Sequence, residues 1–424
     1  MNSNFNGLRK ALCVIATMAA MITPFIVGCC SSDNSKANSK DKVVLEFWNT
    51  MEGREAKIMP EVLAEFHKQN PDIRIEEVSV NFYEAREKFT KSASEGKGPD
   101  LMRADRFWLD RFVQQDLLTE IDQNQLTEEL ADMVPIAREI VTFNDKIWAV
   151  PLSVDSLAMF YNKAHFREKS LKVPTNFDEF SDACIKLTDS SRNRYGFFVN
   201  PNGWYFEPFF FGFGGQYFDP SGNLAIKSDA AKKALEFITH LKEQTMPATN
   251  MKSKVYNLMI NSFANGQISV IFTGSWAIRD IIAGSAFKDN NSELGVEQIP
   301  AGPSGTFSPI GCQSLVISKN TKNKEAAIKF AKFMFSYEVQ KSFTMANYGL
   351  PARRKVFAAP ELKKDPYLQT FIRQLQMSRK AYTHPDQGDI YAPLGNQIIK
   401  VLSGELSIDF ALSDVETEWK AKRK

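Results

Sequence analysis

Ring-bearing side chains are the most informative chemistry in this sequence. Aromatic residues make up 12% of the 424 residues, and nine of the fifteen residues from Trp204 to Phe218 are aromatic. Planar aromatic faces bind apolar or ring-shaped ligands. A run this dense must lie mostly in a core, because full exposure would create an aggregation-prone patch. We therefore expect one or two of these rings to face a ligand and the others to be buried.

Catalytic and metal-binding signatures are missing from the sequence. The chain contains four histidines: His67, His165, His240 and His384. They form no HExxH pair and lie beside no cysteine pair at zinc spacing. There is no GxSxG elbow and no P-loop, and Tyr217 replaces the third glycine of a dinucleotide fingerprint that would start at Gly212. We predict no metal and no cofactor. A carboxylate pair leaves no such trace, so these absences favour binding without excluding catalysis.

The N-terminus has the pattern of a bacterial secretion signal. A basic pair at positions 9 and 10 precedes an apolar run, and residues 1–28 contain no acid. The run is too short and too interrupted for a membrane-spanning helix. Its end, Ile26-Val27-Gly28-Cys29, resembles the bacterial lipobox, in which the cysteine is lipidated. We predict a signal peptide over 1–28, lipidation at Cys29 and a flexible tether through 42. The alternative is a plain signal peptide with an incidental cysteine.

Composition points to a globular protein of two domains or lobes. The length of 424 residues is about three times a typical domain, with 43% hydrophobic and 24% charged residues. Lys and Arg number 52 against 50 Asp and Glu, so no basic excess supports nucleic-acid binding. Cys184 and Cys312 remain in the folded part of the chain, too few for a disulfide framework, and the sequence leaves open whether they pair.

Strand and helix patterns alternate along the chain. The predicted strands are 43–48, 73–78, 268–272 and 315–317. A helix is expected over 60–69 with Pro60 in its first turn, and another after Ser228 as N-cap. A third helix is expected from Ala326 to Met334. This alternation predicts α/β layers around a mainly parallel sheet.

Five blocks then resemble a known family. They are 45–48, 98–101 with 116–121, 147–151 with 160–163, 266–270 with 273–276, and 347–353. In this order and spacing they resemble the extracellular solute-binding proteins of bacterial ABC importers, in the sugar-binding branch that includes maltose-binding protein. The resemblance covers the chain from Val43 onward.

The resemblance implies a type II periplasmic-binding-protein fold, with two α/β lobes joined by a hinge and a ligand held between them. By analogy, lobe one spans 43–153 and 311–355, and lobe two spans 154–310 and 356–424. Closing two lobes buries a small polar ligand, and opening releases it to a membrane partner.

The resemblance also implies acidic ligand contacts. Asp155, in Val154-Asp155-Ser156-Leu157, matches a ligand-binding carboxylate of the family, and Glu52 matches an acidic contact four residues after a tryptophan. Asp105 and Trp108 lie near the family's acid–arginine pair, displaced by two positions. Carboxylates suit sugar hydroxyls because charge-assisted hydrogen bonds are strong.

Aromatic contacts are implied in the same way. Trp276 matches the stacking tryptophan after a strand, and Trp204 matches a stacking tyrosine. Asn202 stands where maltose-binding protein has an acid, and Tyr391 where it has a tryptophan. Because these two positions differ, the resemblance does not name maltose as the ligand.

The leading hypothesis is a monomeric carbohydrate-binding lipoprotein without catalysis, held at the cell envelope by its lipid and serving an ABC permease. A second hypothesis keeps the scaffold but changes the ligand to a charged solute such as a glycerol phosphate or a polyamine. A third is a secreted carbohydrate hydrolase that uses two carboxylates such as Glu52 and Asp155.

Overall fold

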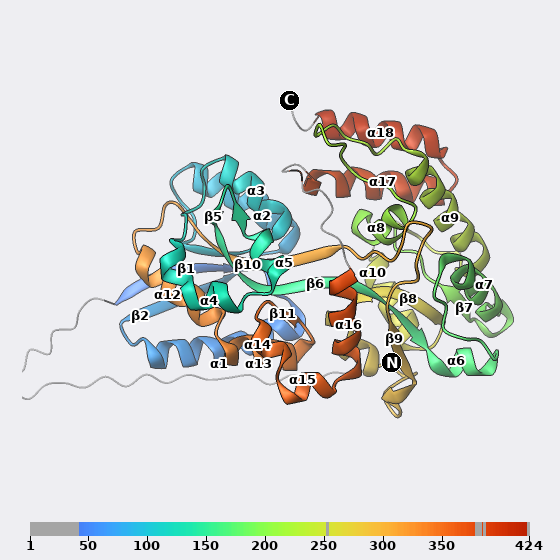
Figure 1. Ribbon diagram of the computed structural model, residues 1–424, viewed down its shortest axis with the longest axis horizontal. Helices are drawn as coiled ribbons and strands as arrows, with labels where there is room; N and C mark the ends of the chain where they lie inside the picture. Colours follow the sequence, from blue (N-terminus) through green and yellow to red (C-terminus); the bar gives the residue numbers. More distant parts are fainter. Residues whose placement is uncertain (1–41, 252–253, 378–383, 385–386, 422–424) are drawn as a thin grey trace, which may run out of the picture. The chain divides into compact units, whose positions relative to one another are not determined.

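The computed structural model describes residues 42–251, 254–377, 384 and 387–421 (Figure 1). Asp41–Lys424 forms one compact unit. The predicted signal peptide, the predicted lipidation at Cys29 and nearly all of the tether lie outside the described residues. Within the described ranges, no helix has both the length and the apolar character needed to cross a bilayer.

The strands are β1 Val43–Asn49, β2 Ile73–Ser79, β3 Leu101–Asp105, β4 Thr142–Phe143, β5 Lys146–Ile147, β6 Ala149–Asn162, β7 Tyr195–Phe197, β8 Ile268–Gly274, β9 Leu294–Glu297, β10 Ile310–Ile317 and β11 Leu350–Pro351. The α-helices are α1 Gly53–Gln69, α2 Phe82–Ser94, α3 Arg106–Gln114, α4 Thr127–Asp132, α5 Pro135–Ile140, α6 Lys163–Glu168, α7 Phe177–Leu187, α8 Gly203–Gly212, α9 Asp229–Thr245, α10 Val255–Ala264, α11 Ile278–Ile282, α12 Lys324–Met334, α13 Tyr337–Asn347, α14 Arg354–Phe357, α15 Pro360–Lys364, α16 Pro366–Met377, α17 Tyr391–Leu402 and α18 Ile408–Ala421.

β6 connects two groups of strands. The main path of the sheet runs β2-β1-β3-β10-β6-β8-β7, and β9 and β11 also pair with β6. The first part of β6 pairs with β10 as far as Ser156, and from Leu157 onward it pairs with β8. We call β2-β1-β3-β10 the first strand group and β8, β7 and β9 the second strand group. Figure 1 shows β6 passing from one group to the other.

The expected α/β class is confirmed, but the expected mainly parallel sheet is wrong in detail. Only β1 with β2, β1 with β3 and β7 with β8 run parallel among the described strands, and the other pairs are antiparallel. The chain leaves the first group along β6 and returns along β10, beside it. Two neighbouring strands that carry the chain in opposite directions must be antiparallel, so the sheet is mixed.

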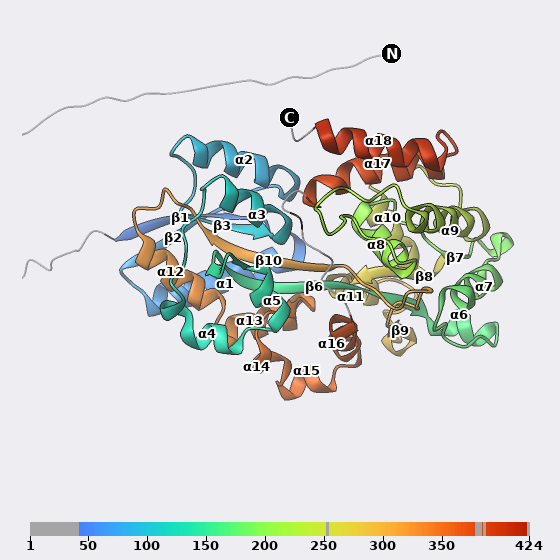
Figure 2. The same cartoon turned by 45° about the horizontal axis from the view of Figure 1, so that its top comes forward.

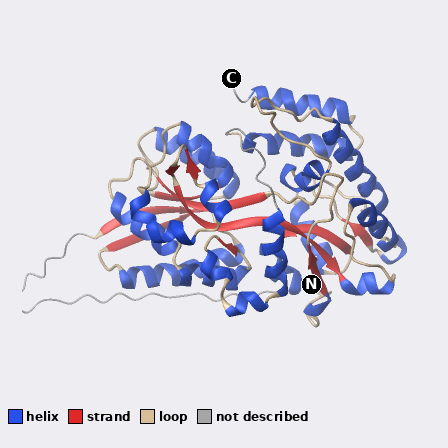
Figure 3. Cartoon of the chain, in the orientation of Figure 1, coloured by secondary structure: helices blue, strands red, loops and turns tan. Residues whose placement is uncertain are grey.

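Helices cover the sheet in both groups (Figures 2 and 3). α12 packs on β1, β6 and β10, whereas α7 packs on β7 and β8. Phenylalanines fill both cores: Phe330 lies between Phe47 and Phe66, at ring-centroid distances of 5.6 and 5.0 Å. Phe180 and Phe272 lie 5.3 Å apart in the second group. Burial of such rings is the main favourable contribution to folding.

One predicted helix boundary is corrected. α1 begins at Gly53, so Pro60 lies inside the helix and not in its first turn. The start gives no sequence signal, because the N-cap Glu52 makes no side-chain cap hydrogen bond and Gly53 has a φ of 57°. By contrast, Ser228 caps α9 as predicted, since its hydroxyl accepts the N–H of Ala231. Cys184 and Cys312 are buried and unpaired.

Candidate functional site

Asp155 lies where β6 changes partners. It pairs with Gly311 of β10, and Leu157, two residues later, pairs with Gly274 of β8. Gly311 is required by this packing, because a Cβ there would lie 3.0 Å from Asp155 Cβ and 3.1 Å from its Oδ2. The Asp155 carboxylate therefore lies against the backbone of Gly311, which has no side chain, at the junction of the two strand groups.

Asp155 is half-buried, and its carboxylate accepts no hydrogen bond within the described part of the chain. Burial raises its pKa to about 7. The Arg103 guanidinium opposes that rise in pKa, while the charges of Glu55 and Asp105 reinforce it. A carboxylate without internal donors is ready to accept hydrogen bonds from a ligand.

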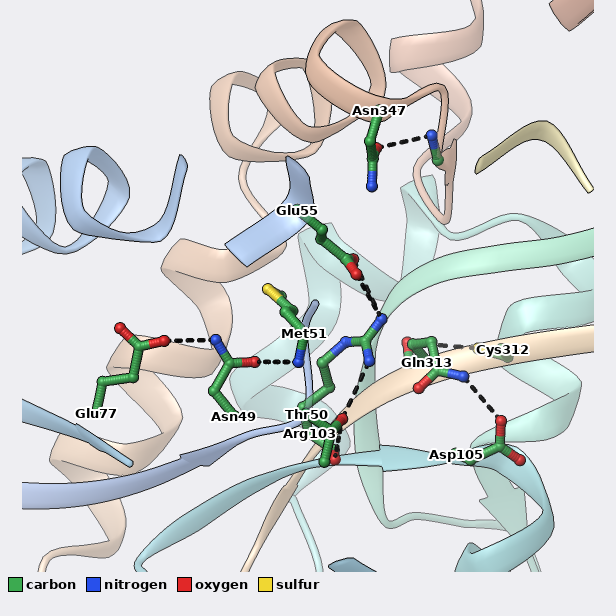
Figure 4. A network of polar contacts seen from close by, with 11 residues as sticks. Asn49, Thr50, Met51, Glu55, Glu77, Arg103, Asp105, Cys312, Gln313 and Asn347 are labelled. Carbon is green, nitrogen blue, oxygen red and sulfur yellow. Dashed lines mark hydrogen bonds and ion pairs between the residues drawn. The ribbon is translucent and has the colours of Figure 1, made fainter. Parts of the chain in front are cut away.

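Arg103 is the centre of a polar network (Figure 4). The guanidinium is only 6% exposed, and its Nη2 donates to both oxygens of Glu55 at 3.0 and 3.1 Å. Its Nη1 donates to Thr50 Oγ1 at 3.1 Å. These bonds connect β3 to the start of α1. Both Nη atoms of Arg103 are therefore paired internally, whereas its buried Nε has no partner among the described residues. The Arg103 charge lowers the pKa of the Asp155 carboxyl.

Glu52 sits in the turn between β1 and α1. Asn49 holds this turn, because its Oδ1 accepts the Met51 N–H while its Nδ2 donates to Glu77 (Figure 4). The Glu52 side chain is exposed and caps no helix. Two residues later, Arg54 reaches Asp280 of α11 at 3.4 Å. Glu52 thus lies two residues before a contact between α1 and α11.

Asp105 ends β3 and caps α3. Its carboxylate accepts the Phe107 N–H at 2.9 Å and Gln313 Nε2 at 2.8 Å, and burial raises its pKa. Trp108 is 8% exposed and packs on Phe82 at a ring-centroid distance of 5.0 Å. These two predicted residues therefore have internal partners in this structure.

Trp276 follows β8 directly and belongs to a group of rings whose other members come from α8 and α10. Its Nε1 donates to Tyr256 Oη at 2.8 Å, which fixes the indole. The ring lies against Gly274, where a Cβ would come within 1.9 Å of Trp276 Cζ3. Trp204, at the start of α8, lies 5.9 Å from Trp276 between ring centroids. We call Trp204, Tyr205, Tyr256 and Trp276 the aromatic group.

Tyr205 links the aromatic group to Asp155. Its ring lies 5.6 Å from Trp204 and 6.2 Å from Tyr256 between centroids. Burial raises the pKa of Tyr205 well above its usual value, and the charges of Tyr256 and Asp155 add to this rise. No sequence pattern distinguished Tyr205 or Tyr256 as site residues. Tyr205 lay inside the aromatic run, whereas Tyr256, on α10, carried no local signal.

The aromatic run behaves as expected. Most of its rings are buried: Phe206, Phe209, Phe210, Phe211, Tyr217 and Phe218. Trp204, Tyr205 and Phe213 are half-buried. Asn202 is exposed and caps α8, with its Oδ1 accepting the Trp204 N–H at 2.8 Å. The cap fixes the direction in which the helix presents Trp204.

Tyr391 opens α17 and reaches two other elements. Its Oη donates to Glu207 Oε1 at 2.6 Å, and its ring packs on Phe107 at 4.9 Å between centroids. Glu207, on α8, is 3% exposed, and burial raises its pKa to about 7, against the effect of the Tyr391 hydrogen bond and Arg106. No sequence pattern distinguished Glu207 from the phenylalanines around it.

The structure thus gathers the predicted residues in two sets. Asp155, Trp204 and Trp276 lie around Tyr205 and Tyr256. Asp105 and Tyr391 both contact Phe107, and Tyr391 also bonds to Glu207. Glu52 belongs to neither set, and Trp108 packs on Phe82 of α2. Among the residues the structure describes, no three His, Cys, Asp or Glu side chains gather as a metal site requires.

A crevice of about 310 Å³, which includes open space at its mouth, adjoins this region. Its lining includes Met51 and Glu55 beside the Arg103 network, Ser153 of β6 and Asn347 at the end of α13. Asn347 Oδ1 accepts the Gly349 N–H at 2.9 Å, which holds the turn into β11. Glu55 is the member of the Arg103 network that lines this crevice, and neither Asp155 nor the aromatic group lines it.

Comparison with known proteins agrees with this geometry. The mixed sheet crossed by β6, with helices on it, matches the periplasmic-binding-protein fold. The GacH receptor of Streptomyces glaucescens, solved unliganded and with acarbose, aligns with a TM-score of 0.83 and 28% identity, over 90% of this chain and 98% of that chain.

The family model of the bacterial extracellular solute-binding proteins matches residues 50–341. The chain therefore belongs to this family: it is a solute-binding protein of the ABC-transporter class and not an enzyme. A maltotriose-binding protein of Pyrococcus abyssi is 26% identical over 369 residues, which cover 85% of this chain and 77% of that protein. A galactooligosaccharide-binding protein of Bacillus subtilis is 24% identical over 426 residues, covering 97% and 98%.

Proposed function

We propose that this protein captures a sugar or oligosaccharide between two lobes and delivers it to the permease of an ABC importer. The observation that carries the proposal is the aromatic group beside Asp155. Half-buried indoles suit the apolar faces of a sugar ring, and a carboxylate that accepts no hydrogen bond from the described residues suits its hydroxyls. The similar proteins named above are described as binding maltotriose, galactooligosaccharide and acarbose.

The proposed lobes follow the boundaries expected from the sequence: 43–153 with 311–355, and 154–310 with 356–424. The switch in β6 pairing between Ser156 and Leu157 supports a junction close to the expected one. On this division Asp105 belongs to lobe one and the aromatic group to lobe two, so closure would bring ligand contacts from both sides.

Delivery from the cell surface is part of the proposal. Lipidation at Cys29 and the tether to residue 42 would hold the protein at the membrane, facing the periplasm or the cell exterior, as a monomer beside its permease. The lipobox-like sequence before Cys29 supports this anchor. Labelling with a clickable fatty acid, with C29A as the control, tests it: wild type should take up the label and the variant should not.

A charged solute is the second candidate ligand. Asp155 and the exposed Glu52 favour a cationic amine over an anion, while Arg103 and Arg106 already bond to Glu55 and to the Ile310 carbonyl. A polyamine is therefore a better rival than a glycerol phosphate.

A thermal-shift screen of the chain from residue 41 separates these candidates. The panel contains mono- and oligosaccharides, polyamines and glycerol phosphates. A ligand that binds only the folded state raises the midpoint as RT ln(1 + [L]/Kd). We expect oligosaccharides to raise it and to be recovered unchanged. A shift with polyamines alone, or cleavage of the sugar, would contradict the proposal.

A further inference from the structure

Asp389 lies buried between two arginines of other elements. It belongs to the 3₁₀ helix η5, Gln387–Ile390, directly before α17. Its Oδ1 accepts from Arg86 Nη1 of α2 at 2.6 Å, and its Oδ2 from Arg111 Nη1 of α3 at 2.8 Å. The Asp389 side chain is 5% exposed, whereas those of Arg86 and Arg111 are 27% and 37% exposed.

The backbone next to Asp389 fits tightly against α3. A Cβ on Gly388 would lie 2.9 Å from Phe107 Cβ and 3.0 Å from its carbonyl oxygen, so only glycine allows this approach. Two residues after Asp389, the Tyr391 ring packs on Phe107. Figure 2 shows the start of α17 beside α3. The segment 387–391 is therefore the part of the C-terminal chain that touches α2 and α3.

We propose that Asp389 is a positioning residue that latches the closed arrangement of the two lobes and so sets ligand affinity without touching the ligand. This inference rests on the proposed function and on its division of the lobes. On that division, Arg86 and Arg111 belong to lobe one and Asp389 to lobe two, so opening separates Asp389 from both arginines.

Charge makes the latch strong and directional. Two cations share one anion. Charge-assisted hydrogen bonds to a carboxylate with so little solvent exposure are among the stronger polar contacts. Removing the anion leaves two partly buried arginines of lobe one without a counter-charge. Opening would expose them to water, so their loss of pairing favours separation of the lobes. By contrast, the pair Arg54–Asp280 also joins the two lobes but is 49% and 66% exposed, and exposed pairs contribute little.

The latch is connected to the ligand site through Tyr391. The Tyr391 hydroxyl bonds to Glu207 on α8, and the same helix starts with Trp204 of the aromatic group. When only the closed form binds tightly, apparent affinity scales with the fraction of molecules that can close. A latch that favours closure therefore tightens binding.

The test compares Asp389→Asn with Asp280→Asn, the matched removal of an exposed interlobe pair. Maltotriose affinity is measured by calorimetry, and small-angle X-ray scattering gives the radius of gyration with and without maltotriose. We expect D389N to bind ~10-fold more weakly, within the usual range of allosteric coupling, and to have a larger radius without ligand. D280N should stay within about twofold of wild type, as for an exposed pair.

A triple variant, R86Q/R111Q/D389N, distinguishes a charge latch from simple packing. Removing both arginines should recover part of the affinity and compactness lost in D389N, because closure then buries no unpaired charge. If D389N fails to fold, the single variants R86Q and R111Q carry the same test with smaller effects. Unchanged affinity and radius in D389N, or in both single variants, would overturn the latch.

Failure of the latch and failure of the proposed function give different results. If wild type binds neither maltotriose nor any other sugar of the thermal-shift panel, the proposed function fails, and the ligand-free radius of D389N still decides the latch. If wild type binds a sugar and D389N binds it equally with an unchanged radius, only the latch fails.

Discussion

Asp155 and Trp276 lie at the same end of the pairing between β6 and β8. Leu157 pairs with Gly274; Asp155 comes two residues before Leu157, and Trp276 comes two residues after Gly274. The two strands are antiparallel, so Asp155 precedes the pair and Trp276 follows it at the same end. The Asp155 carboxylate and the Trp276 indole therefore belong to the same end of this strand pair. This relationship suits a hydroxylated ring, whose edge needs acceptors and whose face needs an apolar surface.

Replacing Trp276 by alanine should weaken sugar binding by ~1–3 kcal/mol, on the scale of aromatic stacking against rings. Calorimetry with the tightest sugar from the thermal-shift screen measures the loss. Trp148→Ala is the matched control, since this half-buried indole donates to the Phe143 carbonyl of β4, away from the aromatic group. Equal affinity in W276A and wild type would remove Trp276 from the site.

Gly274→Ala should weaken binding by displacing the same indole. The added Cβ would overlap Trp276 Cζ3 at 1.9 Å, so the ring must move. We expect ~10-fold weaker binding (about 1.4 kcal/mol) together with a shift in tryptophan fluorescence. Tyr256→Phe, which removes the acceptor of the indole N–H, should have a smaller effect of the same sign, about 0.5–1.5 kcal/mol. A G274A variant with wild-type fluorescence and affinity would contradict this placement.

Sugar affinity should rise with pH through the pKa of Asp155. Burial raises that pKa to about 7 in the free protein, and hydroxyl donors favour the ionised form, so a ligand lowers it. Affinity should then fall by up to about tenfold per pH unit below 7. Calorimetry from pH 5.5 to 8.5 measures the slope.

Asp155→Asn should bind more weakly and with a flat pH profile. Glu207→Gln should keep the slope, which separates the two carboxyls whose pKa values lie near 7. A slope that persists in D155N would assign the pH dependence to another group.

Glu207→Gln should stabilise the ligand-free protein at alkaline pH. The folded-state pKa is raised from 4.5 to about 7, so this group contributes its full stability below 4.5 and loses it as pH rises through 7. The loss at pH 8.5 is up to about 3 kcal/mol, from 1.36 kcal/mol per pKa unit. Thermal unfolding should show E207Q above wild type at pH 8.5 and nearly equal at pH 5.

The exposed Glu236→Gln on α9 is the control for loss of an acid, and it should leave the midpoint unchanged at both pH values. A lower midpoint for E207Q than for wild type at pH 8.5 would mean that the Tyr391 hydrogen bond outweighs the burial of the charge.

Local patterns predicted much of the secondary structure, because apolar periodicity and caps such as Ser228 act over a few residues. They missed the start of α1, where Gly53 and Glu52 give no capping signal. They also missed the antiparallel run of β10 beside β6, since the pairing of strands some 150 residues apart depends on packing. Resemblance supplied Asp155 and Trp276, but Tyr256, Glu207 and Asp389 gain their partners only through tertiary contacts.

A crystal structure of the protein with the tightest oligosaccharide from the thermal-shift screen tests the central claim most directly. We predict a sugar ring stacked on Trp276 or Trp204, with a hydroxyl donating to the Asp155 carboxylate. A sugar bound elsewhere, with Asp155 and the aromatic group untouched, would contradict the account.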